Sequence, residues 1–190
     1  MRGPVLWLVA LLLVGGRIGQ LRAQQPEYID REPEIKAAYL YNFARYVEWP
    51  PAAQTASSAA NAGFAIGIVG DSPVEAPLAN IAASKKLNGR NIVVRKIHSE
   101  AEFRPCQILF VSAGQNSPAT AAIINKARET ATLVVGEGDG FARQRGHIGF
   151  YIDQNSVKFE INAPAAEKAG LKISSKLLSL GRMAGEKQGK

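Results

Sequence analysis

The apolar and polar residues of this chain follow two periods, one typical of helices and one typical of strands. The clearest helical stretch is 35–51, whose apolar stripe recurs at steps of four, four and three residues. The stripe consists of Ile35, Tyr39, Phe43 and Tyr46, and it is widened by Leu40, Ala44 and Val47. Pro33 suits the first turn of a helix, whereas Pro50 and Pro51 cannot continue one. We therefore expect one well-bounded aromatic helix that is largely covered by protein.

Short continuous apolar runs and helical stretches alternate through the middle of the chain. The predicted strands are 64–69, which is continuously apolar, and 91–97, 106–111 and 132–135. Between them, residues 74–83 and 117–130 have helical spacing, and Ser117 with Pro118 is a cap and first-turn pair. Two strand–helix–strand units of this kind are typical of a parallel sheet that is covered on both faces.

The last third of the chain changes to a hairpin pattern. Two β-rich runs, 147–152 and 157–161, are separated by four turn-forming residues, which predicts an antiparallel pair. Asn162 and Ser174 are each placed to cap a short helix, with an extended segment between them. We predict a single-domain α/β fold with a mostly parallel sheet from two βαβ units. A C-terminal antiparallel hairpin extends this sheet, and the aromatic helix forms the N-terminal element.

The first 23 residues have the layout of a secretory signal peptide, with a short basic start and an apolar run from Pro4 to Val14. This run is shorter than the roughly 20 residues that span a bilayer comfortably. An uncleaved anchor is the alternative. We expect one exported domain at 24–190, with a flexible loop at 52–63 and a frayed tail at 185–190.

Charge and cysteine content limit the classes of function. The formal charge of +7 falls to +4 without residues 1–23, because three arginines and no acidic residues leave with them. Such a mild and scattered excess does not indicate nucleic-acid binding. Cys106 is the single cysteine, so an exported chain of this kind has no internal disulfide. We expect Cys106 to be a small buried apolar residue, with a reactive thiol or an intermolecular bridge as alternatives.

Two features that suggest chemistry have simpler structural explanations. A phosphate loop at 136–140 would need a helix directly after the glycines, whereas 141–146 is expected to lead into a strand. A calcium loop needs more oxygen ligands than Glu137 and Asp139 offer, so a plain turn is favoured. His98 and His147 lie far apart without neighbouring metal ligands, and no serine occupies a G-x-S-x-G elbow. We expect no metal, no cofactor and no enzymatic activity.

A ligand-binding rim is the first candidate site. In open parallel sheets, ligands bind beyond the carboxyl ends of the strands. Asp71 and Ser72 follow one predicted strand and Ser112 follows another, although the glycine fingerprint of a dinucleotide site is absent. These three residues are our candidates for binding a small molecule.

A partner-binding surface is the second candidate site. The aromatic helix has more apolar faces than one sheet contact requires, and Tyr and Trp are enriched at interface hot spots. Arg143, Arg145 and His147 lie close together before the hairpin, as a solvated loop or as a basic docking patch for an acidic partner.

The chain also resembles the YfiR-like family (DUF4154-type proteins), periplasmic bacterial proteins that restrain a membrane-bound diguanylate cyclase. The resemblance covers nearly all of 24–190. The most specific segments are the first, YLYNF at 39–43 with Trp49 and Pro50, and the last, AGLKISSKLL at 169–178. Between them lie IVGD at 68–71, CQILFVS at 106–112, GHIGF at 146–150 with Phe141, and VKFEIN at 157–162.

This resemblance implies a periplasmic, dimeric α/β protein that is not an enzyme. Its role would be to bind the periplasmic sensor domain of a membrane diguanylate cyclase and to limit cyclic di-GMP and biofilm formation, with an outer-membrane partner able to release the cyclase. The positions within the matched segments and the basic loop suggest the partner-binding residues Tyr41, Asn42, Arg45, Trp49, Arg143 and Arg145. Unlike better-known members, which carry several cysteines in disulfides, this chain has Cys106 alone.

Overall fold

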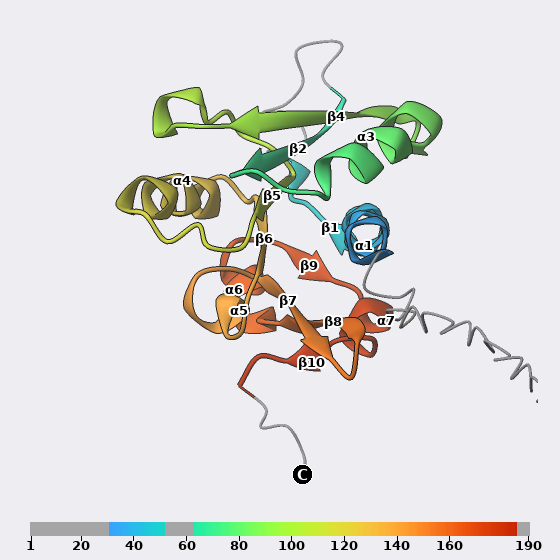
Figure 1. Cartoon of the computed structure of the whole chain (residues 1–190), viewed down its shortest axis with the longest axis vertical. Helices are drawn as coiled ribbons and strands as arrows, with labels where there is room; N and C mark the ends of the chain where they lie inside the picture. Colours follow the sequence, from blue (N-terminus) through green and yellow to red (C-terminus); the bar gives the residue numbers. More distant parts are fainter. Residues whose placement is uncertain (1–30, 52–62, 186–190) are drawn as a thin grey trace, which may run out of the picture.

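The structure is a computed structural model that describes residues 31–51 and 63–185 (Figure 1). The predicted signal peptide, nearly all of the predicted loop at 52–63 and the tail beyond residue 185 lie outside the described residues. The described part forms one α/β domain around a curled sheet, as predicted.

An eight-stranded sheet runs through the domain in the order β10-β8-β7-β6-β5-β2-β4-β3. The strands are β2 (Phe64–Val69), β3 (Lys86–Leu87), β4 (Arg90–Ile97), β5 (Ile108–Val111), β6 (Leu133–Glu137), β7 (Ile148–Asp153), β8 (Ser156–Ile161) and β10 (Arg182–Met183). The five central strands from β7 to β4 are mutually parallel. The antiparallel hairpin of β7 and β8 then extends the sheet, which confirms the predicted topology.

Helices lie on both faces of this sheet, as continuous apolar strands require. They are α1 (Glu32–Tyr46), α3 (Glu75–Ser84), α4 (Pro118–Glu129), α5 (Phe141–Gln144), α6 (Ala163–Lys168), α7 (Ser175–Leu178) and the 3-10 turn η2 (Glu100–Glu102). The predicted caps are present. Ser117, Asn162 and Ser174 accept hydrogen bonds from the backbone N–H groups of Thr120, Ala165 and Leu177 at 3.1, 3.1 and 3.3 Å.

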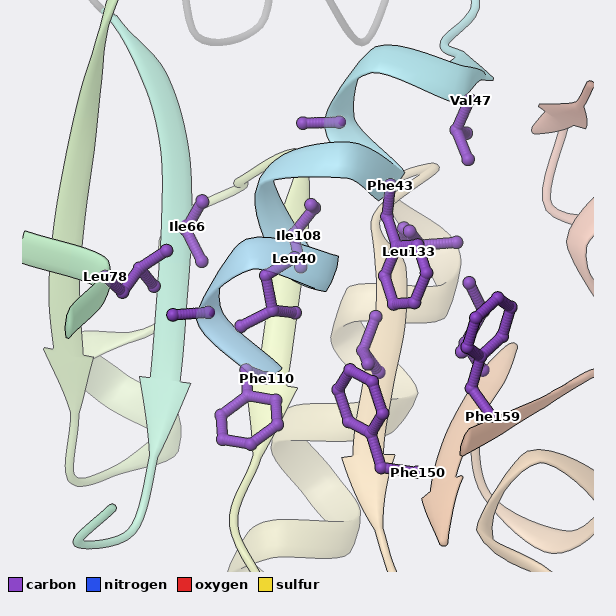
Figure 2. Packing of buried hydrophobic residues seen from close by; sticks show 14 of the residues in the cluster. Leu40, Phe43, Val47, Ile66, Leu78, Ile108, Phe110, Leu133, Phe150 and Phe159 are labelled. Carbon is purple, nitrogen blue, oxygen red and sulfur yellow. The ribbon is translucent and has the colours of Figure 1, made fainter. Parts of the chain in front are cut away.

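The sheet separates two hydrophobic clusters. The larger cluster holds α1 and α3 against one face, where Phe43 contacts Phe150 and Phe159 at ring-centroid distances of 5.7 and 5.1 Å (Figure 2). The smaller cluster lies on the other face and contains residues of α4 together with Phe141. The aromatic helix and the α5 region are therefore on opposite faces of the sheet.

The aromatic helix is shorter than predicted, and its buried face is different. It ends at Tyr46, because Val47 and Glu48 form strand β1 and pair with β9 (Lys172–Ile173) in a separate two-stranded sheet. Burial centres on Leu40 and Phe43, each 0% exposed, together with Ala37 and Ala44. The predicted stripe therefore contributes only Phe43 to the fully buried face, and Ile35, Tyr39 and Tyr46 pack at its margin. Leu40 and the two alanines are buried more completely than Tyr39 and Tyr46, so the size of an aromatic ring alone does not decide which face of the helix packs on the sheet.

The segment after the glycines at 136–140 is also different from the prediction. It opens the short helix α5 after Gly140, whose φ of +74° is a left-handed conformation that favours glycine, before the chain enters β7. The ring of Phe141 lies on Gly136 and Gly146, since a Cβ at either glycine would be 2.3 Å from a ring carbon. The four-residue helix thus serves to place Phe141 in the smaller cluster. Strand β10, which pairs with β8 at the sheet edge, was not predicted.

Candidate functional site

A cleft of about 640 Å³ lies beyond the carboxyl ends of β2, β5 and β6, beside the first turn of α1. Parallel strands place their carboxyl ends at one edge of the sheet, and the residues that follow them form a rim there. The lining residues are Glu32, Pro33, Lys36, Asp71, Pro73, Val74, Ala113, Glu137, Gly138, Asp139, Phe150, Tyr151 and Ile152. This is the edge at which the strand pattern predicted a ligand-binding rim.

Lys36 is a buried charge in the wall of this cleft. The whole Lys36 residue is 7% exposed, and its ammonium group forms ion pairs with the carboxylates of Glu32 and Glu137. The other carboxylate oxygen of Glu137 accepts a hydrogen bond from the N–H of Ala113 at 2.7 Å. Burial lowers the pKa of Lys36, but the hydrogen bonds and charges of Glu137 and Glu32 outweigh it and raise the pKa above 10.5. Lys36 therefore joins the start of α1 to the ends of β5 and β6.

The cleft is acidic although the protein as a whole is basic. Four carboxylates and one ammonium group line it, which gives this edge a formal charge of −3. Asp71 forms an exposed ion pair with Lys96, at 3.2 Å between Nζ and Oδ1. Asp139 is exposed and makes no ion pair with another residue in the described ranges. The cleft therefore presents negative charge to solvent, which favours a cationic ligand over an anionic one.

The three predicted ligand residues occupy different positions. Asp71 lines the cleft, whereas the hydroxyl of Ser72 accepts a hydrogen bond from the N–H of Val74 at 3.2 Å and helps to begin α3. Ser112 is 4% exposed, and its hydroxyl has no hydrogen-bond partner among the residues that the structure describes. The residue after it, Ala113, faces the cleft instead. Lys36 was not among the predicted site residues. Glu137 and Asp139 were not among them either, because the sequence of 136–140 favours a plain turn.

A second candidate surface combines aromatic and basic side chains on the solvent side of α1. The guanidinium of exposed Arg45 lies 6.0 Å from the ring centroid of Tyr41 and 5.8 Å from that of Tyr46. Lys176 of α7 lies 5.3 Å from the ring of Tyr46. We call Tyr41, Arg45, Tyr46 and Lys176 the α1 surface. Such cation–π contacts hold the long basic side chains over half-buried rings.

The remaining predicted partner-binding residues do not all belong to the α1 surface. Asn42 is half-buried on α1. Trp49 is 8% exposed, and its indole N–H donates to the carbonyl of Gln107 at 3.1 Å, so it is a core residue with little area left for a partner. Arg143 and Arg145 lie at α5, on the other face of the sheet. Arg145 donates to the carbonyl oxygen of Gln115 at 2.7 Å and fixes the loop between β5 and α4.

The two histidines and the cysteine form no common site. His147 is 1% exposed, and its Nδ1 accepts a hydrogen bond from the N–H of Val134 at 2.9 Å. Burial lowers the pKa of His147 to about 4, with a smaller contribution from the charge of Arg128. Burial also raises the pKa of the Cys106 thiol to about 11. Within 31–51 and 63–185, no three His, Cys, Asp or Glu side chains gather as a metal site would require.

A family model described as YfiR/HmsC-like (DUF4154) matches residues 33–182, which is most of the chain. The chain belongs to the YfiR/HmsC-like family. This membership implies a regulatory role in cyclic di-GMP signalling at the level of the family.

Other comparisons add little to the YfiR/HmsC-like assignment. No curated protein matched the chain. Among solved structures, a conserved domain protein from Vibrio cholerae O1 biovar El Tor is similar over 69% of this chain and 59% of that one, at 16% identity and a TM-score of 0.47. An ABC domain in complex with L-Trp from Streptococcus pneumonia gives the same coverages, at 14% identity and a TM-score of 0.45. The chain thus spans little more than half the length of either.

The residues that carry the YfiR/HmsC-like resemblance are mainly structural. Phe43, Phe150 and Leu171 are at most 1% exposed, and Asn162 caps α6. These segments therefore contain much of the family's core and a helix cap. They also contain Tyr41 and Lys176 of the α1 surface and Asp71 of the cleft. In the part of the chain that the structure describes, every helix is too short or too polar to cross a membrane.

Proposed function

We propose that this protein is a periplasmic regulator that binds the periplasmic sensor domain of a membrane diguanylate cyclase. By holding that domain in its inactive state, the protein would limit cyclic di-GMP. Membership of the YfiR/HmsC-like family over residues 33–182 is the observation that supports this proposal most strongly. A homodimer and release by a competing outer-membrane partner belong to the same proposal. The switch requires only that the regulator bind the two states of the sensor domain with different affinity.

We propose that the α1 surface makes the contact with the sensor domain. Tyr and Arg are the residue types that most often dominate binding energy at interfaces. Arg45 and Lys176 are both exposed and positive, and Tyr41 and Tyr46 offer half-buried rings beside them. Because these four residues come from α1 and α7, their arrangement depends on the pairing of β1 with β9. A partner with an acidic and apolar surface would match this chemistry.

The test is a binding and signalling experiment with a membrane diguanylate cyclase from the same organism. The exported chain is immobilised, and the affinity of the purified sensor domain is measured by surface plasmon resonance. Arg45→Glu and Lys176→Glu should each weaken binding by about tenfold or more, because reversal places like charges at the contact. In cells, deletion of the gene should raise cyclic di-GMP, and the Arg45→Glu protein should fail to restore it.

Arg143→Glu is the matched control for this experiment. It reverses the same kind of exposed charge on α5, on the opposite face of the sheet, and was itself a predicted partner-binding position. Loss of binding in Arg143→Glu with normal binding in Arg45→Glu would move the interface to the α5 face. Unchanged cyclic di-GMP on deletion of the gene would contradict the regulatory role as a whole.

A second candidate function is binding of a small molecule in the strand-end cleft. The specific observation in its favour is the cleft of about 640 Å³, which lies within the usual size range of ligand sites. It is compatible with the regulatory role, since a ligand could tune affinity for the partner. Thermal unfolding against a metabolite panel tests it: at least one reproducible rise in Tm supports the function, and a flat response across the panel contradicts it.

A further inference from the structure

We infer that the strand-end cleft selects organic ammonium ions that carry an apolar body, such as arylalkylamines, and excludes carboxylates of the same shape. This inference rests on the second candidate function and adds to it the chemical class of the ligand. It combines three observations: a cleft of about 640 Å³ that is open to solvent, the sign of the charge at its rim and the apolar residues in its walls.

The charges at the rim determine the sign of the ligand. Glu137 and Glu32 both pair with Lys36, so these three groups together carry a net formal charge of −1 in the wall of the cleft. Asp139 has no ion-pair partner among the described residues, and Asp71 meets only the exposed ammonium group of Lys96. These two carboxylates would attract a cation that enters the cleft and would repel an anion.

The walls of the cleft determine the rest of the ligand. Pro33, Pro73 and Val74 line it from α1 and the start of α3, and Ile152 of β7 lines it while remaining 51% exposed. A large exposed aliphatic side chain at the edge of a cavity is available to cover an apolar ligand. A bare metal ion would gain nothing from these walls, and a ligand with one charged end and one apolar end would use both parts of the cleft.

Lys36 forms an immobile part of the wall of this site. Its ammonium group is held by two carboxylates and is buried, so it cannot move out to neutralise Asp139. The same pairs keep Glu137 oriented toward the N–H of Ala113, at 2.7 Å, and thus hold the ends of β5 and β6 together. The site is preformed to this extent, which lowers the cost of ordering it when a ligand binds.

The experiment uses three probes of nearly equal size: phenethylamine, 2-phenylethanol and phenylacetate, which are positive, neutral and negative at pH 7. Each is titrated into the ¹⁵N-labelled exported chain, and amide chemical shifts are followed. Phenethylamine should bind saturably, with shifts at Ala113 and Gly138, and about tenfold more tightly than 2-phenylethanol. Phenylacetate should bind more weakly than the alcohol. Raising the salt concentration should weaken phenethylamine binding only.

Two variants locate the site. Asp139→Asn removes the unpaired carboxylate in an exposed turn and should weaken phenethylamine binding by about threefold to tenfold. Glu129→Gln is the matched control: it removes one exposed carboxylate at the end of α4, near the amino end of β6, and should leave the Kd unchanged. Far-ultraviolet circular dichroism confirms that both variants are folded.

The outcomes separate this inference from the function on which it rests. Equal or tighter binding of phenylacetate at the cleft overturns the ligand class, while small-molecule binding itself stands. Phenethylamine binding that is equally strong in Asp139→Asn overturns the proposed location. If none of the three probes binds, the inference fails, and the metabolite panel then decides whether the cleft binds any small molecule. Binding of anionic metabolites would support the second candidate function. No rise in Tm across the panel would contradict both the inference and the second candidate function.

Discussion

Acid should destabilise this protein through one buried side chain, His147. Its neutral imidazole accepts the N–H of Val134 at 2.9 Å, and only a deprotonated Nδ1 can accept this bond. Protonation would turn the acceptor into a donor that faces another donor, inside a site where His147 is 1% exposed. Burial accordingly lowers the pKa of His147 to about 4, below the 6.5 of an unfolded chain.

The sign and size of the effect follow from proton linkage. Between pH 6.5 and pH 4 the unfolded chain binds a proton at His147 that the folded chain does not bind. Stability is therefore lost as the pH falls through this window, by up to about 1.4 kcal/mol per pH unit and about 3 kcal/mol in total. Above pH 6.5 both states are neutral at His147, so this contribution no longer changes with pH.

The assay is urea unfolding at pH 7, 6, 5 and 4, followed by circular dichroism, on three proteins. His147→Asn keeps an oxygen that can accept the N–H of Val134 but does not titrate. It should be less stable than wild type at pH 7 by about 1–2 kcal/mol, because the smaller side chain leaves a void. The difference should shrink as the pH falls and reverse its sign before pH 4, because the wild-type loss of about 3 kcal/mol is larger than this initial difference. His98→Asn, at an exposed position, is the matched control and should run parallel to wild type.

Parallel curves for wild type and His147→Asn from pH 7 to pH 4 would refute this reasoning. So would an imidazole proton resonance of His147 that titrates near pH 6.5 in the folded protein. Acidic residues elsewhere contribute equally to all three proteins, so the difference between the curves isolates His147.

Three further predictions concern the cleft and the core. Lys36→Met should lower the free energy of unfolding by about 2–4 kcal/mol in urea denaturation, because it leaves the mostly covered carboxylate of Glu137, 13% exposed, without its cation. Glu137→Gln in the same chain should restore part of this loss, and a double variant less stable than Lys36→Met would contradict the pairing. Cys106, buried and with a pKa raised to about 11, should react with Ellman's reagent only in denaturant; fast reaction of the folded protein would show that it is accessible. Gly136→Ala should cost about 1–3 kcal/mol, since its Cβ would meet the Phe141 ring at 2.3 Å, and an unchanged Tm would rule out that close packing.

The sequence predicts most of the fold because its strands are short, apolar and separated by strong turn and cap signals. Ser117, Asn162 and Ser174 cap helices as expected, for local hydrogen bonding alone decides those positions. The end of α1 could not be predicted in this way. Val47 lies outside the helix and pairs with Ile173, more than a hundred residues away, and local periodicity does not indicate a pairing at that distance. Strand β10, two residues at the sheet edge, is equally invisible to periodicity.

For the candidate site, the sequence predicted only the edge of the sheet at which it would lie. Strand order placed Asp71 at the carboxyl ends of the strands, and Asp71 lines the cleft at that edge. Lys36 is one of the few charged residues in a mostly apolar helix, and its partner Glu137 lies in a glycine-rich segment typical of a turn. Only the tertiary packing of α1 against β6 joins them. Binding at the cleft and at the α1 surface stays a prediction until the experiments above are done.

The distant partners of α1 bear on how the chain is made. A ribosome releases α1 early, yet Phe43 packs against Phe150 and Phe159, which are synthesised more than a hundred residues later. Until then the aromatic side of this helix lacks the strands that cover it in the folded protein. In the nascent chain this exposed side favours aggregation. Holding chaperones should therefore recognise the segment around Phe43 first, and truncations that end before β8 should aggregate.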